Sequence, residues 1–371
     1  MRTISPEQAA LIEEARAEGI IALRAAILEK DILVTEALRA ISEVKLPGFD
    51  LTFSGGTCLA KAYGLVERMS EDIDLRLQID GYKTLSRSAL RRSLSELKKR
   101  LANAFGAAQF GLPDGCMRAR NENRFVSFEL AYQSRFPPDV ALRSTVRVEF
   151  MAIPPRLTPT RLTMAPLMDR LTQRTTAAGV TLPCLSIDET YCEKIISYLR
   201  RATEHLVGRP RSQYEERLAR HVYDVHRIVT ERPRRPTRDL QLLFNDILAT
   251  DVEQYGNRID GFRVDAAAML RRTLVGIPQR PEFREHYERF VAELVYGGAR
   301  PGFDEAFTTF AAGADALLQA ARSSAVREPP YAKRCQSAQL TRRVPARAVA
   351  RAGARRGAPA GRRSPRRRTA T

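Results

Sequence analysis

Two glycines and two aspartates, close together in the sequence, constrain this chain more than any other feature. Gly55 and Gly56 follow a short apolar run, and Asp72 and Asp74 stand at the start of a segment in which apolar residues alternate. Alternation with a period of two is typical of a strand, and a glycine pair after an apolar run is typical of a tight turn. The stretch therefore predicts a strand, a turn, a helix and a second strand, at residues 51–53, 54–57, 58–66 and 73–79.

The glycine turn has the properties of a phosphate cradle. Glycines let the backbone approach an anion closely, and a helix that begins there directs free amides at it. Lys61 follows Thr57 by one helical turn and so shares its face. We predict nucleotide binding by Gly55, Gly56, Thr57 and Lys61, with a solvated Lys61 as the alternative. Arg68 is a further candidate, or it pairs with a neighbouring glutamate.

The two aspartates predict a cation site. Two residues apart on a strand, Asp72 and Asp74 leave the same face, with Cα atoms roughly 6.6 Å apart. Two carboxylates about 4 Å apart repel by roughly 4 kcal/mol at an effective dielectric near 20, so the pair favours a bound cation. Magnesium binds through one or two carboxylates together with substrate phosphates. We expect Mg²⁺, with Mn²⁺ as the alternative, and a nucleoside triphosphate as substrate.

A third acidic residue is expected on a neighbouring strand. In the segment 145–153, Val146, Val148 and Phe150 share one face, so that Arg147 and Glu149 lie on the other and can both reach the nucleotide. Glu129, in the strand-like segment 125–132, is the competing candidate.

The order of elements predicts an α+β domain followed by helices. Residues 6–43 have helical periodicity, with a break expected near Asp31, and 85–105 form a basic amphipathic helix. Beyond about Leu185 the pattern is helical throughout, at 188–203, 214–230, 237–254, 258–275, 281–296 and 303–322. We therefore expect three parts: a sheet-containing domain at 1–165, a helical domain at 166–323 and a disordered tail at 324–371.

Charge does not by itself identify a partner. The chain of 371 residues has a net charge of +18, but the segment from Ser324 onward contains fourteen Lys or Arg residues and one acid. The remainder is only mildly basic, so composition does not establish nucleic-acid binding. The arginine-rich segment lacks apolar periodicity, which predicts disorder.

Cysteine spacing and hydropathy indicate a cytoplasmic protein. The five cysteines are widely spaced, without a C-x-x-C pair or nearby histidines at zinc spacing, which favours reduced thiols. No stretch approaches the roughly 18 apolar residues of a membrane span, and the N-terminus lacks the apolar core of a signal peptide.

A longer pattern around the glycines and aspartates carries a family resemblance. The run Gly-Gly-Thr-x-Leu-x-Lys-x-Tyr-Gly-Leu at 55–65 continues through Arg68 to Ser-Glu-Asp-Ile-Asp-Leu at 70–75. It resembles the signature of the AbiEii/AbiGii toxins, nucleotidyltransferases of the DNA polymerase β-like superfamily that act in type IV toxin–antitoxin systems. Glu29-Lys30-Asp31 resembles the N-terminal segment of the family, and the similarity extends to about residue 232.

The resemblance implies further site residues and partners. In the family a lysine and an aspartate on successive helices complete the site, and Lys194 and Asp224 occupy the matching positions. His221 stands where the family usually has an acid. The resemblance also implies a polymerase β-like mixed sheet with flanking helices, an RNA acceptor, with tRNA 3′ ends known for some relatives, and an antitoxin encoded alongside.

Two other functions fit the same motif. A non-catalytic nucleotide-binding protein could keep the fold, and small-molecule nucleotidyltransferases of the antibiotic-modifying type share the glycine turn and the paired aspartates. The helical region and the 29–31 segment favour the toxin-like family over the latter. His205, His226 and His286 have no partners at ligand spacing, and we interpret them as structural or surface residues.

Overall fold

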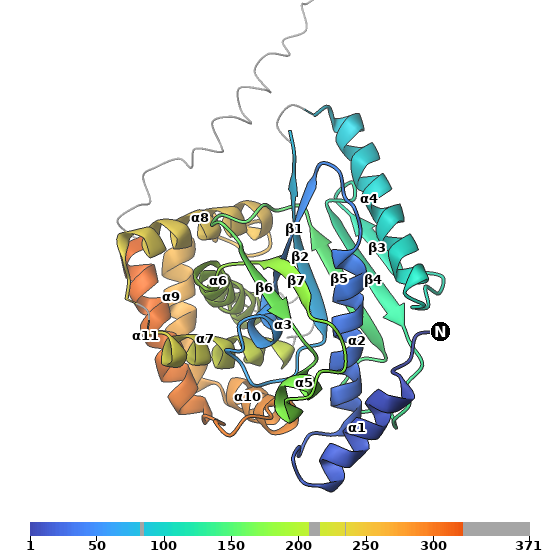
Figure 1. The fold of residues 1–371 in the computed structure, drawn as a ribbon. Helices are drawn as coiled ribbons and strands as arrows, with labels where there is room; N and C mark the ends of the chain where they lie inside the picture. Colours follow the sequence, from blue (N-terminus) through green and yellow to red (C-terminus); the bar gives the residue numbers. More distant parts are fainter. Residues whose placement is uncertain (82–84, 208–215, 234, 322–371) are drawn as a thin grey trace, which may run out of the picture. The chain divides into compact units, whose positions relative to one another are not determined.

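The segment that begins with the paired aspartates forms the centre of a seven-stranded sheet (Figure 1). The computed structural model describes residues 1–81, 85–207, 216–233 and 235–321, and the predicted arginine-rich tail lies outside them. The strands are β1 Phe49–Ser54, β2 Asp72–Ile79, β3 Met117–Arg120, β4 Phe125–Ala131, β5 Thr145–Met151, β6 Thr160–Met164 and β7 Val180–Cys184.

The sheet is mixed, with the order β3-β4-β5-β2-β1-β7-β6. β2 runs parallel to β5 and β1 runs parallel to β7, whereas the other neighbours are antiparallel. A mixed sheet with flanking helices confirms the predicted fold class. The two central strands, β1 and β2, are those on either side of the glycine turn.

Helices from the first part of the chain cover one face of the sheet. They are α1 Pro6–Ala17, α2 Ala25–Ser42 and α4 Arg87–Ala107, and their apolar residues form one buried core with those of the strands. The predicted break near Asp31 is wrong. The chain interrupts its helices at Gly19, which has φ +71°, and α2 continues through Asp31 because tertiary partners satisfy that carboxylate.

The helices after residue 185 form a second core. They are α6 Ile187–Leu206, α7 Ala219–Glu231, α8 Arg238–Tyr255, α9 Ala266–Gly276, α10 Pro281–Leu294 and α11 Phe303–Ala321, with single 3-10 turns at Glu216–Leu218 and Ile277–Gln279. α9 begins later than predicted, because Gly261 adopts φ +79° and Asp265 caps the helix at the Ala268 amide. Among the described residues, no helix combines the length and apolarity needed to cross a membrane.

Three strands, β3, β6 and β7, and one short helix were not predicted. The strands β6 and β7 and the helix α5 Leu167–Thr172 occupy the region expected to link the two domains. β7 pairs with β1 at Phe53 and Cys184, so the sheet includes residues beyond the predicted boundary at 165. These strands have five residues each and β7 contains Pro183, which gives a weak strand signal. The division into domains stays a prediction.

The helix that begins with the two glycines, three residues earlier than predicted, belongs to both cores. α3 spans Gly55–Lys61, and Cys58 packs in the core beneath the sheet, whereas Leu59 and Ala60 pack with the C-terminal helices. The glycine turn is therefore held where the sheet and the helical region meet.

Candidate active site

The glycine turn lies directly against two charged side chains. Gly55 has φ +77°, and a Cβ atom there would overlap the carboxylate of Asp74. A Cβ atom on Gly56 would overlap the guanidinium of Arg68. Only glycine permits both the backbone conformation and these approaches. The sequence pattern thus brings the turn and the second aspartate together, as predicted.

The side chain of Thr57 forms hydrogen bonds within the protein. It is fully buried, and its hydroxyl donates to the backbone oxygen of Asp72 and lies 2.8 Å from the Ser70 hydroxyl oxygen. Its side chain therefore fixes the entry to β2, and any contact with a nucleotide would come from its backbone.

The acidic residues form a row across two parallel strands. Asp72 and Asp74 share one face of β2, and Asp74 is in register with Glu149 of β5. The apolar residues of β5 point into the core, as the alternation predicts, so Glu149 faces the site and Glu129 lies one strand further away. Burial, together with the charges of Asp72 and Glu149, raises the pKa of Asp74 to about 7. Burial also raises the pKa of Glu149, against the lowering effect of Arg147.

Arginines partly compensate this negative charge. Arg143 Nε and Arg220 Nη2 each lie 3.6 Å from Asp72 carboxylate oxygens, and Arg147 Nη2 lies 2.7 Å from Glu149 Oε1. The sequence pattern placed Arg147 on the same face as Glu149, whereas Arg143 and Arg220 were not predicted. Arg220 precedes Asp224 by one helical turn, a spacing that could have indicated it, whereas Arg143 follows no pattern.

The residues present are suited to a cation held by two carboxylates. Among the described residues, no group of three or more His, Cys, Asp or Glu side chains could hold a metal ion. Asp72 Oδ1 is nevertheless buried without a hydrogen-bond partner in the described part of the chain. A magnesium ion needs only one or two protein carboxylates when a substrate supplies phosphates. Asp72 and Asp74 fit that requirement.

Lys194 and Asp224 meet beside the glycine turn. Lys194 Nζ lies 2.7 Å from Asp224 Oδ2, and Arg68 binds both oxygens of the same carboxylate at 2.6 and 2.7 Å. Burial alone would raise the pKa of Asp224, but the charges of Arg68 and Lys194 outweigh it and hold that pKa well below its usual range. Burial lowers the pKa of Lys194, and Asp224 opposes that change.

Arg68 serves this cluster. It is 1% exposed, and Nη1 also donates a 3.0 Å hydrogen bond to the Met69 carbonyl. In the structure its guanidinium binds and orients the Asp224 carboxylate, and its contact with a nucleotide stays a prediction.

His221 is held in the neutral form. Burial, reinforced by the charges of Lys194 and Arg220, lowers its pKa well below the ordinary value, and Nδ1 lies 3.3 Å from the Lys194 carbonyl oxygen. A neutral imidazole here adds no charge to a site already rich in cations.

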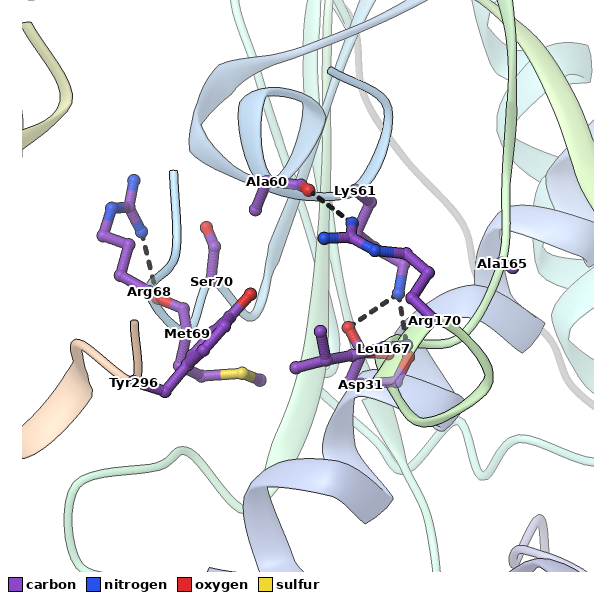
Figure 2. Close-up of a pocket in the computed structure, with 10 residues that line it drawn as sticks. All are labelled: Asp31, Ala60, Lys61, Arg68, Met69, Ser70, Ala165, Leu167, Arg170 and Tyr296. Atoms are coloured by element: carbon purple, nitrogen blue, oxygen red, sulfur yellow. Dashed lines mark hydrogen bonds and ion pairs between the residues drawn. The ribbon is translucent and has the colours of Figure 1, made fainter. Parts of the chain in front are cut away.

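Lys61 is paired with Asp31 in a pocket that Arg68 also lines. Its ammonium is 2.6 Å from Asp31 Oδ1, and both side chains line a small pocket behind α3 (Figure 2). Asp31 also accepts a hydrogen bond from the Leu167 amide, and Arg170 donates to the Ala60 carbonyl in the same pocket. In the structure the ammonium of Lys61 is therefore paired with a carboxylate of the protein, and its contact with a phosphate stays a prediction.

The mixed sheet, the glycine turn and the paired carboxylates are features of the nucleotidyltransferase class. The family model described as nucleotidyl transferase AbiEii toxin, Type IV TA system, matches residues 37–309, so the chain belongs to that family of toxins. No curated protein sequence matches the chain.

Two solved structures are similar to it. The nucleotidyltransferase toxin MenT4 from Mycobacterium tuberculosis H37Rv has 19% identity and a TM-score of 0.36, over 84% of this chain and 98% of its own. An antigenic nucleotidyltransferase-like protein from Paracoccidioides brasiliensis has 16% identity and a TM-score of 0.33, over 65% of this chain and 92% of its own.

Proposed function

We propose that this chain transfers a nucleoside monophosphate from a nucleoside triphosphate to a hydroxyl group of an RNA acceptor, with magnesium as the ion. One observation carries the proposal: Asp74 lies against Gly55 on one side and in register with Glu149 on the other. A phosphate bound at the glycines would therefore lie next to the carboxylates that would hold the cation. Membership of a nucleotidyltransferase family supports the reaction type.

Asp72 and Asp74 are the residues that would hold the ion. The raised pKa of Asp74 indicates a carboxylate with little compensating positive charge, and Asp72 Oδ1, although Arg143 Nε lies 3.6 Å away, is buried without a hydrogen bond. A divalent cation bound there would neutralise charge on the triphosphate.

The remaining residues would position the reactants. The hydroxyl oxygen of the acceptor forms a bond to the α-phosphorus, the bond from that phosphorus to the bridging oxygen breaks, and pyrophosphate leaves. Glu149, whose pKa is raised, is placed to take the hydroxyl proton. Lys194 would neutralise a phosphate oxygen from the side of the helices, and Asp224 would keep its ammonium in place.

The family also suggests the biological setting. We infer a cognate antitoxin as the protein partner and a cytoplasmic site of action, since the matching family is that of type IV toxins. We retain as proposals the nucleotidyltransferase domain at 1–165 and the helical domain at 166–323, with Lys194 and Asp224 brought to the site by the second.

Label transfer tests the proposal. Purified wild type, Asp74→Asn and the matched control Asp50→Asn are incubated with each α-labelled ribonucleoside triphosphate, RNA and either magnesium or a chelator. Asp50 lies on neighbouring β1 and is exposed, so its variant removes an acid without touching the site. We expect wild type and the control to label RNA only with magnesium, and Asp74→Asn to lose roughly 100-fold or more of the rate. Triphosphate binding without any transfer by wild type would instead support the non-catalytic reading.

A further inference from the structure

A row of paired residues crosses the sheet from the carboxylates to its edge. Asp74 is in register with Glu149, Glu149 with Ser127 of β4, and Ser127 with Arg118 of β3. Residues that pair directly on neighbouring strands project from the same face. Arg118 therefore lies on the face of the sheet that carries the site. Its distance from Asp74 across three strand spacings is roughly 14 Å.

Arg118 and Arg120 present two cations at this edge. They alternate along β3, so both project from the face with the carboxylates, roughly 6.6 Å apart along the strand. Both are exposed, and no carboxylate in the described part of the chain forms an ion pair with either. β3 is an edge strand, and in Figure 1 the C-terminal helices lie well away from it.

The arginines of this face that lie nearer the carboxylates are neutralised. Arg147 pairs with Glu129 and Glu149, at 3.4 and 2.7 Å. Arg76 of β2 pairs with Glu189 and Glu193, and on the opposite edge strand β6 the single Arg161 is exposed. In the described part of the face, β3 is therefore the edge strand that carries two exposed arginines in line.

The hairpin that carries these arginines is anchored. Three residues with positive φ, Asn121, Glu122 and Asn123, turn the chain from β3 into β4. Arg87 of α4 binds the Glu122 carboxylate, and Asn123 Nδ2 donates to Ser95 at 3.0 Å. The position of β3 relative to the site is therefore set by contacts to α4 as well as by strand pairing.

We propose that Arg118 and Arg120 bind successive backbone phosphates of the RNA acceptor, so that its 3′ end crosses β4 and β5 and places the terminal hydroxyl at Asp74 and Glu149. The inference rests on the proposed function and identifies where its acceptor docks. Charge complementarity favours a polyanion, and continuity with the carboxylate row favours a strand that ends in the site. Guanidinium groups bind phosphates through paired hydrogen bonds, which suits two arginines in line.

Direct binding tests this surface separately from catalysis. A short 5′-labelled single-stranded RNA with a free 3′ hydroxyl is titrated with protein by fluorescence anisotropy, without triphosphate, at several salt concentrations. Arg118→Gln/Arg120→Gln is compared with Arg118→Lys/Arg120→Lys and with the control Arg272→Gln/Arg280→Gln. The control removes two exposed arginines from α9 and the loop before α10, far along the chain from the sheet. Circular dichroism checks the fold of each.

We expect the glutamine pair at 118 and 120 to weaken RNA binding about tenfold or more and to lower the salt slope by about 1.4, as for two lost single-strand phosphate contacts. The lysine pair should retain most of the affinity, and the control should change it less than about twofold. Equal losses for the glutamine pair and the control would overturn the inference. So would a wild type that binds no RNA, or a glutamine pair that loses only a protein partner.

A second readout separates this inference from the proposed function. If wild type binds RNA through these arginines but transfers no nucleotide, the proposed function fails and the surface stands. If Arg118→Gln/Arg120→Gln transfers nucleotide with unchanged kcat and unchanged KM for RNA, the surface fails and the proposed function stands. We expect unchanged triphosphate affinity and a raised KM for RNA.

Discussion

Arg68 and Asp224 form a buried pair across 156 residues of sequence, through hydrogen bonds of 2.6 and 2.7 Å. Lys194 binds the same carboxylate, so one acid carries two buried cations. The pair links the segment before β2 to helix α7, and thereby fixes the position of the helical core beside the glycine turn.

Asp224→Asn should destabilise the protein strongly. Removal of the charge leaves Arg68 and Lys194 uncompensated in the interior, which costs about 3–5 kcal/mol of unfolding free energy. Because the folded pKa of Asp224 is depressed, its contribution is present above the unfolded value near 3.9 and is lost only as pH falls towards the folded pKa. Urea unfolding at pH 7 measures the loss, with Asp50→Asn as the control. A variant as stable as that control would show that the cluster does not hold the fold.

Gly55→Ala should abolish nucleotide transfer. The methyl group would displace the Asp74 carboxylate, and the residue would also have to adopt φ +77°. Gly64→Ala is the matched control, because it has φ +63° and open space around the added carbon. Both variants should lose about 1 kcal/mol or more of stability from backbone strain. Only Gly55→Ala should lose roughly 100-fold in kcat, and comparable kcat losses in the two would attribute the effect to strain alone.

Lys61→Met and Lys194→Met should separate structure from binding. Lys61 is paired with Asp31 inside the pocket of Figure 2, so its loss should lower the unfolding free energy by about 3–5 kcal/mol and leave triphosphate affinity unchanged. Lys194→Met should weaken that affinity, because we propose that its ammonium meets a phosphate, while Arg68 still compensates Asp224. Isothermal titration with a non-hydrolysable triphosphate and magnesium measures both. The opposite pattern of affinities would restore Lys61 to the active site.

The stability of the protein should depend on Lys30 at alkaline pH. Burial, opposed by Glu71, lowers the pKa of Lys30 to about 8. Between pH 8 and the unfolded value near 10.4 the unfolded chain binds more protons, so the stability of wild type should rise with pH in that window relative to Lys30→Met. The difference between the two should shift by about 2 kcal/mol between pH 7 and 10. Urea unfolding at both pH values checks this, and exposed Lys99→Met should show no such shift.

The sequence was sufficient to predict those parts of the site whose geometry follows from local periodicity. Two-residue alternation placed Asp72 and Asp74 on one face and turned Glu149 towards them, and the glycine pair indicated the turn that receives Asp74. Each of these positions follows from the repeat of a strand or from the backbone freedom of glycine.

Other features depended on partners far away in the sequence. Helical spacing put Lys61 on the same face as Thr57, but Asp31, which lies 30 residues earlier, determines where its ammonium goes. A helix break was expected near Asp31 because its partners, Lys61 and the Leu167 amide, lie far away in the sequence and could not be foreseen. No local pattern could show that Arg68 forms an ion pair with Asp224.

Because α3 packs in both cores, the position of the glycine turn depends on the packing of each. Cys58 packs under the sheet and its neighbour Leu59 packs among the helices, and both belong to the short helix that begins with Gly55 and Gly56. A cavity in either core would therefore remove a contact of this helix. Loosened packing far from the carboxylates is thereby transmitted to the glycine turn. We expect a cavity in either core to displace the glycine turn before it unfolds the protein.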